Sequence, residues 1–219
     1  MSSNFIQALA GARLYPVTDR HLSGLSHAEQ VIHLIDGGAT LIQLREKTQP
    51  PSEFYAEAKT AIHVAHQRSV KIIINDRVDI ALALKADGVH LGQEDLPPEA
   101  ARRILGPDAV IGFSTHSLEQ AKLAAKMPVD YVAVGPIFPT TTKTSANVPV
   151  GLKGLRLFRQ ALGSIPIVAI GGITATNIRL VLDAGADAAA VISDIWTPPS
   201  EIPGKIRQLI NVSQPRPTS

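Results

Sequence analysis

The sequence contains no cysteine, few aromatic residues and almost no net charge, and the first and the last of these absences each exclude a class of site or partner. Without cysteine the chain forms no disulfide, no thiolate nucleophile and no sulfur-ligated metal site. The 21 basic residues exceed the 19 acidic residues by only two, so the charge balance does not favour nucleic acid or a membrane surface as a partner. The 4% of aromatic residues suits a core of small branched side chains.

Long apolar segments are also missing. No apolar run approaches the roughly 18–20 residues that a membrane-spanning helix needs. The stretch from Met1 to Gly11 lacks a cationic segment followed by a hydrophobic one, which is the pattern of a secretory signal. The sequence is therefore predicted to be cytoplasmic, and the oligomeric state is left open.

Eight short apolar runs are present, and each is followed by polar or glycine residues. The runs are 14–17, 41–44, 72–74, 89–91, 110–113, 131–134, 167–170 and 188–192. A parallel strand that is buried on both faces has this near-continuous apolar pattern. Eight such strands with helices between them predict an α/β fold, a single-domain (β/α)8 TIM barrel, whose functional groups gather at the C-terminal ends of the strands.

The helical patterns between these runs complete the predicted domain. Helices are expected at 27–37, 52–67, 77–84, 97–105, 117–126, 152–162, 175–183 and 201–210. We assign 1–11 to an N-terminal extension, 12–212 to the barrel and 213–219 to a flexible tail. The same alternation permits an open doubly wound sheet, but there polar groups are expected only near the switch point of the strand order.

A pair of glycines follows the seventh predicted strand, and a serine follows the eighth. Gly171-Gly172 and Ile192-Ser193 stand where many barrels of this type bind phosphate through backbone N–H groups. The alternative is that the two glycines merely form a tight turn. Their position favours phosphate binding.

Three cations fall in the predicted loops at the same end of the barrel. Arg45 and Lys47 follow the second strand, and Lys143 lies in a loop rich in threonine after the sixth. Each cation alone is more typical of a solvated surface charge. Together at one rim they indicate a cradle for an anion.

Two aspartates follow neighbouring strands. Asp76 follows the third strand and Asp95 follows the fourth, so both carboxylates are expected beside the anion cradle. Hard carboxylate oxygens next to phosphate suggest Mg²⁺ that protein and substrate hold jointly. The alternative for each aspartate is to cap the helix that follows it. His90 lies within the fourth strand, and the alternative to a functional role is that it is a hydrogen-bonded histidine of the core.

Five segments, in order, resemble the signature of the thiamine phosphate synthase family. They are Gln43–Lys47, Asn75–Asp79, Gly88–Asp95, Gly135–Lys143 and Gly171–Ile173, and the resemblance covers roughly residues 12–196. It implies a transferase of thiamine biosynthesis that joins hydroxymethylpyrimidine diphosphate to thiazole phosphate. The reaction would release pyrophosphate by a dissociative, Mg²⁺-assisted mechanism.

The resemblance also implies a role for each matching residue. Asp76 and Asp95 would hold Mg²⁺, with no other cofactor. The diphosphate would be bound by Arg45, Lys47, Asn75, Ser114 and Lys143, and all but Asn75 of these are predicted to be catalytic. The pyrimidine would contact Gln43 and His90. The thiazole phosphate would be held by Thr140, Thr142, Gly172, Ile192 and Ser193.

Two residues depart from what this arrangement needs. Pro16 lies inside the first predicted strand, where it donates no ladder hydrogen bond, so a late start or a bulge is expected there. Asp194 follows Ser193, where its charge repels a phosphate unless the side chain points away.

Two rival functions are a thiazole isomerase of the same superfamily and a non-catalytic barrel that binds a phosphorylated metabolite and regulates a partner. Neither needs the Asp76, Asp95 and Lys143 set.

Overall fold

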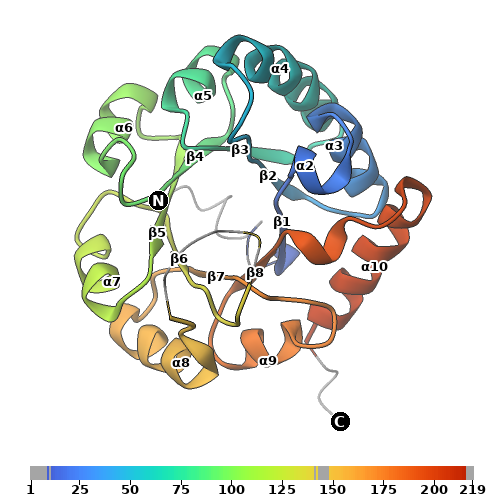
Figure 1. The fold of residues 1–219 in the computed structure, drawn as a ribbon. Coiled ribbons are helices and arrows are strands. Elements are labelled where there is room, and N and C mark those ends of the chain that lie inside the picture. Colours follow the sequence, from blue (N-terminus) through green and yellow to red (C-terminus); the bar gives the residue numbers. More distant parts are fainter. Residues whose placement is uncertain (1–8, 10, 141, 143–147, 216–219) are drawn as a thin grey trace.

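A computed structural model describes residues 9, 11–140, 142 and 148–215 of the chain, and these form a ring of parallel strands inside a ring of helices (Figure 1). The strands are β1 (Leu14–Pro16), β2 (Leu41–Leu44), β3 (Lys71–Asn75), β4 (Gly88–Leu91), β5 (Val110–Thr115), β6 (Tyr131–Val134), β7 (Ile167–Ile170) and β8 (Ala188–Val191). Every strand pairs in parallel with its sequence neighbours from β2 to β8, and β8 pairs with β1. The predicted TIM barrel is confirmed.

The helices on the outside include every one predicted from the sequence. They are α3 (His27–Asp36), α4 (Pro51–Gln67), α5 (Val78–Leu84), α6 (Pro98–Leu105), α7 (Leu118–Ala124), α8 (Gly151–Leu162), α9 (Ile178–Asp183) and α10 (Ile202–Ser213). The structure adds a one-turn helix, α2 (Arg20–Ser23), and two short 3₁₀ turns, η1 (Ser193–Ile195) and η2 (Pro199–Glu201). No helix in the described ranges is long and apolar enough to cross a membrane.

Local sequence signals explain where the helices begin. Ser26 caps α3 in a capping box, in which its side chain accepts from the N–H of Glu29 while the Glu29 carboxylate accepts from the N–H of Ser26. Proline opens α4 at Pro51 and α6 at Pro98, where the missing N–H costs no intrahelical bond. These starts place each helix directly after the loop that carries rim residues.

Barrel closure between β1 and β2 is limited by Pro16. The N–H of Val17 donates to Val191 on β8, and the N–H of Thr18 donates to Gln43 on β2. Alternate residues face alternate neighbours, so Pro16 faces β2 and has no N–H to offer there. Between β1 and β2 only an isolated bridge from Val17 to Gln43 is formed. The strand nevertheless begins at Leu14, so the expected late start is wrong, and the gap in the ladder at Pro16 falls at the seam of the barrel.

The barrel interior is filled by side chains rather than open. Tyr15, Leu41, Ile73, Tyr131 and Val168 belong to one buried cluster, while a larger cluster lies between the sheet and the helices. A Cβ atom on Gly112 of β5 would lie 2.0 Å from the ring of Tyr131. Glycine at that position thus makes room for a large ring inside the barrel.

The N-terminal end of the barrel repeats one stabilising arrangement three times. Asp87, Asp130 and Asp187 each precede an even-numbered strand, and each accepts a hydrogen bond from the backbone of the preceding strand, at 2.8, 2.9 and 2.7 Å. Each carboxylate also pairs with a cation, namely Lys71, Arg102 and Arg159 in that order. This end of the barrel is therefore built for stability, which leaves the opposite rim for function.

Candidate active site

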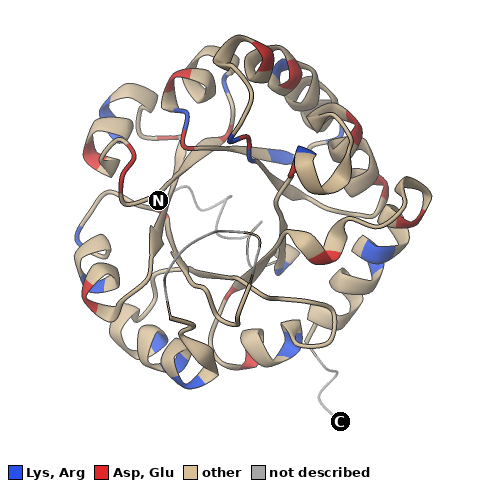
Figure 2. Ribbon diagram, in the orientation of Figure 1, with Lys and Arg blue, Asp and Glu red and all other residues tan. Residues whose placement is uncertain are grey.

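The C-terminal rim combines an aspartate pair with cations at the ends of β2, β3 and β4. Figure 2 shows charged residues of both signs over the outer helices, and a further group at this part of the rim. The Lys47 ammonium forms an ion pair with the Asp76 carboxylate, and the Arg45 guanidinium donates to Asp19 at 2.8 Å. Arg45 and Lys47 are therefore each paired with a carboxylate.

Neither aspartate caps a helix, so the alternative interpretation of both is wrong. Asp76 has a left-handed backbone with φ of 62°, and the N-cap of α5 is Arg77, with no side-chain capping bond. The N-cap of α6 is Pro97, again without a side-chain bond, whereas Asp95 turns back to accept from the N–H of Gly92 at 2.6 Å. Left-handed geometry is uncommon for a non-glycine residue and gathers at functional sites.

The two carboxylates influence each other. Burial of Asp95 raises the pKa of its carboxyl group, and the neighbouring Asp76 adds to that rise against the opposing hydrogen bond from Gly92. Within the described part of the chain no group of three or more histidine, aspartate or glutamate side chains is placed to hold a metal. A cation at this pair would thus take its remaining ligands from bound substrate or water.

Asn75 adds an unsatisfied donor next to this pair. The residue ends β3, and only 4% of its surface is exposed. Its amide nitrogen is buried without a hydrogen-bond partner among the residues that the structure describes. A buried donor of this kind is costly unless something binds it. Contact between the Asn75 amide and the diphosphate, as predicted, would offset that cost.

A continuous polar chain crosses the top of the barrel interior. The Gln43 amide donates to the hydroxyl of Tyr15 at 3.3 Å, and the hydroxyls of Tyr15 and Tyr131 lie 3.1 Å apart. His90 then contacts the Tyr131 hydroxyl through Nδ1 at 2.9 Å and the Ser114 hydroxyl through Nε2 at 2.8 Å. His90 is hydrogen bonded as a core histidine is, but its partners include another predicted site residue, Ser114.

Sequence reasoning missed both tyrosines of this chain. Tyr15 and Tyr131 were counted only as apolar members of strands, yet with Gln43, Arg45 and His90 they line a small cavity inside the rim. Burial raises the pKa of both phenols, so both remain protonated at neutral pH. The available signal was a tyrosine within a strand of otherwise aliphatic residues, because a buried phenol needs a polar partner.

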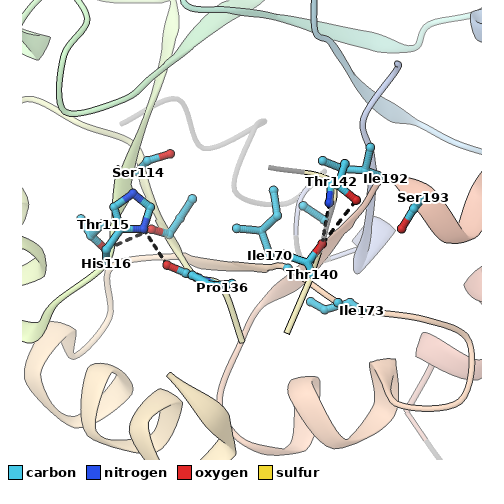
Figure 3. Close-up of a pocket in the computed structure, with 15 residues that line it drawn as sticks. Ser114, Thr115, His116, Pro136, Thr140, Thr142, Ile170, Ile173, Ile192 and Ser193 are labelled. Atoms are coloured by element: carbon cyan, nitrogen blue, oxygen red, sulfur yellow. Dashed lines mark hydrogen bonds between the residues drawn. The ribbon is translucent and has the colours of Figure 1, made fainter. Parts of the chain in front are cut away.

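A second cavity lies over the ends of β5 to β8. Figure 3 shows Ser114 and His116 on one side of it and Thr140, Thr142 and Ser193 on the other. His116, a further residue that sequence reasoning missed, is held by a 2.6 Å hydrogen bond between Nδ1 and the Gly135 carbonyl. The remaining lining includes the predicted residues Gly172 and Ile192. The five residues predicted for the thiazole phosphate therefore line one cavity.

The two glycines after β7 make the wall of that cavity. Gly171 and Gly172 have φ of 101° and 65°, which favours glycine. A Cβ on Gly172 would lie 2.7 Å from the Pro139 carbonyl oxygen, and one on Gly171 would lie 2.6 Å from the Pro136 ring. The glycines therefore form a tight turn that lets the two loops approach closely. Phosphate binding at this turn stays a prediction.

The charge of Asp194 is directed elsewhere. Its carboxylate accepts from the N–H of Ala175 at 2.9 Å and pairs with the Lys205 ammonium at 3.0 Å. Asp194 is not among the residues that line the cavity, although Ser193 is. The expected conflict with a phosphate is thereby removed, and Asp194 instead ties the loop after β8 to the loop before α9.

The structure groups the predicted residues into three neighbouring sets. Gln43, Arg45 and His90 line the inner cavity, and Lys47, Asn75, Asp76 and Asp95 lie at the ends of β2 to β4. The outer cavity collects Ser114, Thr140, Thr142, Gly172, Ile192 and Ser193. Ile192, Ile170, Ala133 and Ala190 line both cavities, so the two are adjacent. Lys143 lies outside the described residues.

Comparison with known proteins gives a consistent result. A family model described as thiamine monophosphate synthase matches residues 14–195. The chain is 46% identical over 205 residues to the thiamine-phosphate synthase of Chloroflexus aurantiacus, covering 92% of this chain and 94% of that protein. It is 46% identical over 197 residues to the corresponding protein of Syntrophomonas wolfei, covering 90% and 93%. A thiamine phosphate pyrophosphorylase structure from Pyrococcus furiosus aligns with a TM-score of 0.84 at 40% identity, covering 94% and 96%.

Proposed function

The chain belongs to the thiamine monophosphate synthase family, and on that premise we propose how its rim performs the reaction. The protein is a transferase that condenses hydroxymethylpyrimidine diphosphate with thiazole phosphate to give thiamine phosphate and pyrophosphate. The observation that carries the mechanism is the pair of adjacent cavities beside the aspartates and cations of the rim. Two substrates in adjacent cavities present their reacting atoms to each other across a shared boundary.

The inner cavity is suited to the pyrimidine. It is lined by apolar side chains and by the polar groups of Gln43, Tyr15, Tyr131 and His90, which match a flat heteroaromatic ring with donors and acceptors on its edge. Because these groups already hydrogen bond to one another, their directions are set before the ligand arrives. Such preorganisation lowers the entropy lost on binding.

The outer cavity accepts the thiazole phosphate in this proposal. The hydroxyls of Thr140, Thr142 and Ser193 and the backbone around Gly172 supply neutral donors to a phosphate. The apolar wall formed by Ile170 and Ile192 faces both cavities and keeps water from the space between the two rings. Exclusion of water protects a reactive pyrimidine-methyl cation until the thiazole nitrogen reaches it.

The cations of the rim act on the leaving group. In the dissociative step the bond between the pyrimidine methylene carbon and the diphosphate oxygen breaks, and the electron pair leaves with pyrophosphate. The thiazole nitrogen then donates its lone pair to the methylene carbon, which forms the new bond. Arg45, Lys47 and Lys143, with donors from Asn75 and Ser114, stabilise the charge that grows on the leaving pyrophosphate.

Asp76 and Asp95 would hold Mg²⁺. They fit a hard divalent cation because two oxygen donors share one place, where burial and mutual repulsion raise the pKa of Asp95. The Lys47 ammonium already pairs with Asp76, so a positive charge is accommodated there. When bound, the ion would supply positive charge to the diphosphate oxygens. The dissociative step needs no protein nucleophile.

One assay tests the proposal. Purified protein is incubated with both substrates, with Mg²⁺ and then after chelation, and thiamine phosphate is measured. Product with Mg²⁺ and none after chelation is the expected result. Product that is independent of any divalent ion would overturn the role of the aspartate pair. Absence of product in every metal condition would contradict the catalytic function and favour the isomerase or the regulatory barrel.

A further inference from the structure

His27 is buried beneath the Arg45–Gln49 segment, and no part of the proposed mechanism uses it. His27 is the first residue of α3 and has no exposed surface. Its imidazole ring packs against the ring of Phe54 on α4, with centroids 5.3 Å apart. Its Nδ1 lies 2.9 Å from the Thr18 hydroxyl, and its Nε2 lies 3.3 Å from the Glu46 carboxylate. Glu46 stands between the two cations Arg45 and Lys47. His27 thus links the core of the protein to the rim.

The chemistry of these groups sets the direction of the hydrogen bonds. Burial lowers the pKa of His27, so the ring is neutral at physiological pH and carries one proton. Glu46 is ionised and only accepts, so the proton resides on Nε2 and is donated to Glu46. Nδ1 then accepts from the Thr18 hydroxyl, whose oxygen in turn accepts from the N–H of Arg45 at 3.0 Å. The ring therefore connects the backbone of Arg45 to the side chain of Glu46.

Glu46 also hydrogen bonds to the turn that carries Lys47, so it connects His27 to that turn. Its other oxygen accepts from the N–H groups of Lys47, Thr48 and Gln49 at 2.7, 2.7 and 3.1 Å, and from the Thr48 hydroxyl at 2.9 Å. Burial pushes the pKa of Glu46 upward, but these hydrogen bonds outweigh it and lower the pKa to about 2. The carboxylate is thus held away from the anion site, although its neighbours are the proposed diphosphate cations.

Glu57 of α4 secures the other side of the same unit. Its carboxylate accepts from the backbone N–H of His27 at 3.0 Å and from the Gln49 amide at 3.0 Å, and it lies 3.6 Å from the Arg20 guanidinium. Together, Glu46 and Glu57 fasten the Glu46–Gln49 turn to α2, α3 and α4. The turn therefore has supports from three helices rather than the freedom of an ordinary surface loop.

We propose that His27 is a positioning residue for the diphosphate half of the site, acting through Glu46 on Arg45 and Lys47. The inference rests on the proposed function. Without the His27 hydrogen bond, the Glu46 carboxylate is released to approach the guanidinium of Arg45 and the turn loosens around Lys47. Both effects weaken the binding of a polyanion and leave the thiazole phosphate cavity, which contains none of these residues, unchanged.

The test compares two replacements of His27. His27→Phe retains a ring against Phe54 and removes both hydrogen bonds, whereas His27→Gln retains an N–H donor within reach of Glu46. His63→Phe, on the exposed side of α4, is the matched control. Pyrophosphate affinity with Mg²⁺ is measured by calorimetry, and the KM for each substrate is measured separately. We expect His27→Phe to weaken pyrophosphate binding and to raise the KM for the diphosphate substrate about tenfold, which is the order of effect when buried hydrogen bonds are lost.

The KM for the second substrate, thiazole phosphate, serves as an internal control. The KM for thiazole phosphate stays within about twofold of wild type, and His27→Gln recovers most of the pyrophosphate affinity. Equal rises in both KM values, or unchanged pyrophosphate affinity with only a lower melting temperature, would show that His27 is structural and overturn the inference. If His27→Phe does not fold, Glu46→Gln replaces it and is expected to give the same selective loss.

Pyrophosphate binding also separates this inference from the proposed function. A wild-type protein that binds pyrophosphate but makes no thiamine phosphate would contradict the function, while the affinities of the variants still decide the role of His27. A wild-type protein that does not bind pyrophosphate with Mg²⁺ would overturn the positioning role directly.

Discussion

The hydroxyls of Tyr15 and Tyr131 lie 3.1 Å apart inside the barrel, although 116 residues separate them in the chain. Tyr15 comes from β1 and Tyr131 from β6, and their rings meet edge to face with centroids 6.0 Å apart. Their contact joins Gln43 on one side to His90 on the other. Two strands that are distant in the sequence thus share one polar chain that lines the proposed pyrimidine cavity.

Removal of one hydroxyl tests that chain. Tyr131→Phe keeps the ring and leaves the Tyr15 hydroxyl and Nδ1 of His90 without this partner. We expect the KM for the pyrimidine diphosphate to rise by about 5- to 30-fold, because the loss of buried hydrogen bonds costs roughly 1–2 kcal/mol. Tyr55→Phe, on the half-exposed face of α4, is the control. Steady-state kinetics that show an unchanged KM would place the pyrimidine elsewhere.

Asp76 is expected to set the affinity for the divalent ion. Asp76→Asn replaces a charged oxygen ligand with a neutral one, so the Mg²⁺ concentration for half-maximal activity should rise about tenfold or more. Asp79→Asn is the matched control, because Asp79 pairs with Arg77 and is largely exposed. Calorimetric titration of Mg²⁺ in the presence of pyrophosphate gives a readout that needs no turnover. Identical titration curves for wild type and Asp76→Asn would remove Asp76 from the metal site.

The fold was largely predictable because parallel strands in a barrel are buried on both faces. The runs at 41–44, 131–134 and 167–170 match β2, β6 and β7 at both ends. The four-residue helix α2 was missed because it buries none of its side chains and leaves no apolar stripe in the sequence. Pro16 led to the expectation of a late start or a bulge, but β1 begins at Leu14, and the consequence of the missing N–H is instead the sparse pairing between β1 and β2.

The site was predictable in its residue types and less so in its contacts. Aspartate is common both at helix N-caps and at metal sites, so the sequence left both roles open for Asp76 and Asp95 until the backbone settled which residue caps each helix. The tyrosines were hidden because an interior phenol and an interior leucine give the same apolar pattern. Asp194 was read as a conflict with phosphate because its partner Lys205 follows 11 residues later, on α10.

Lys143 is expected to act mainly on the rate of the chemical step. Lys143→Ala should lower kcat by about 10²–10³, which is typical when one contact to charge developing in a transition state is removed. Lys153→Ala, an exposed residue of α8, controls for the loss of a cation nearby in sequence. Single-turnover kinetics at saturating substrates measure the step directly. A wild-type chemical rate with only a higher KM would make Lys143 a binding residue.

His27 is expected to make the folded state sensitive to mild acid. Burial, with a contribution from Arg20, lowers the pKa of His27 below its usual 6.5, although Glu57 and Glu46 oppose the shift. As the pH falls through 6.5, the unfolded chain binds a proton that the folded chain does not, so the free energy of unfolding falls by at most about 1.4 kcal/mol per pH unit.

Denaturant unfolding at several pH values between 7 and 5 measures this slope. His27→Gln lacks the titrating group and should lose less stability over that range than wild type. The hydrogen bonds of Glu46 contribute stability that is lost only as the pH falls below about 4.5, where that carboxylate protonates in the unfolded chain, so they do not affect the comparison. Parallel slopes for the two proteins would show that another group dominates the acid response.

Gly172 is expected to control access to the outer cavity. Its φ of 65° strains any side chain, and a Cβ there would lie 2.7 Å from the Pro139 oxygen and 2.8 Å from the Phe138 Cβ atom. Gly172→Ala should therefore push the loop before Thr140 away from the wall and raise the KM for thiazole phosphate, with less effect on the KM for the diphosphate substrate.

Gly163→Ala is the control, because Gly163 has φ of 58° but no atom near its Cβ position. That control isolates the backbone strain, which costs about 1 kcal/mol. If Gly172→Ala and Gly163→Ala lower stability equally and leave both KM values unchanged, the turn serves only the fold, and the phosphate is bound elsewhere on the rim.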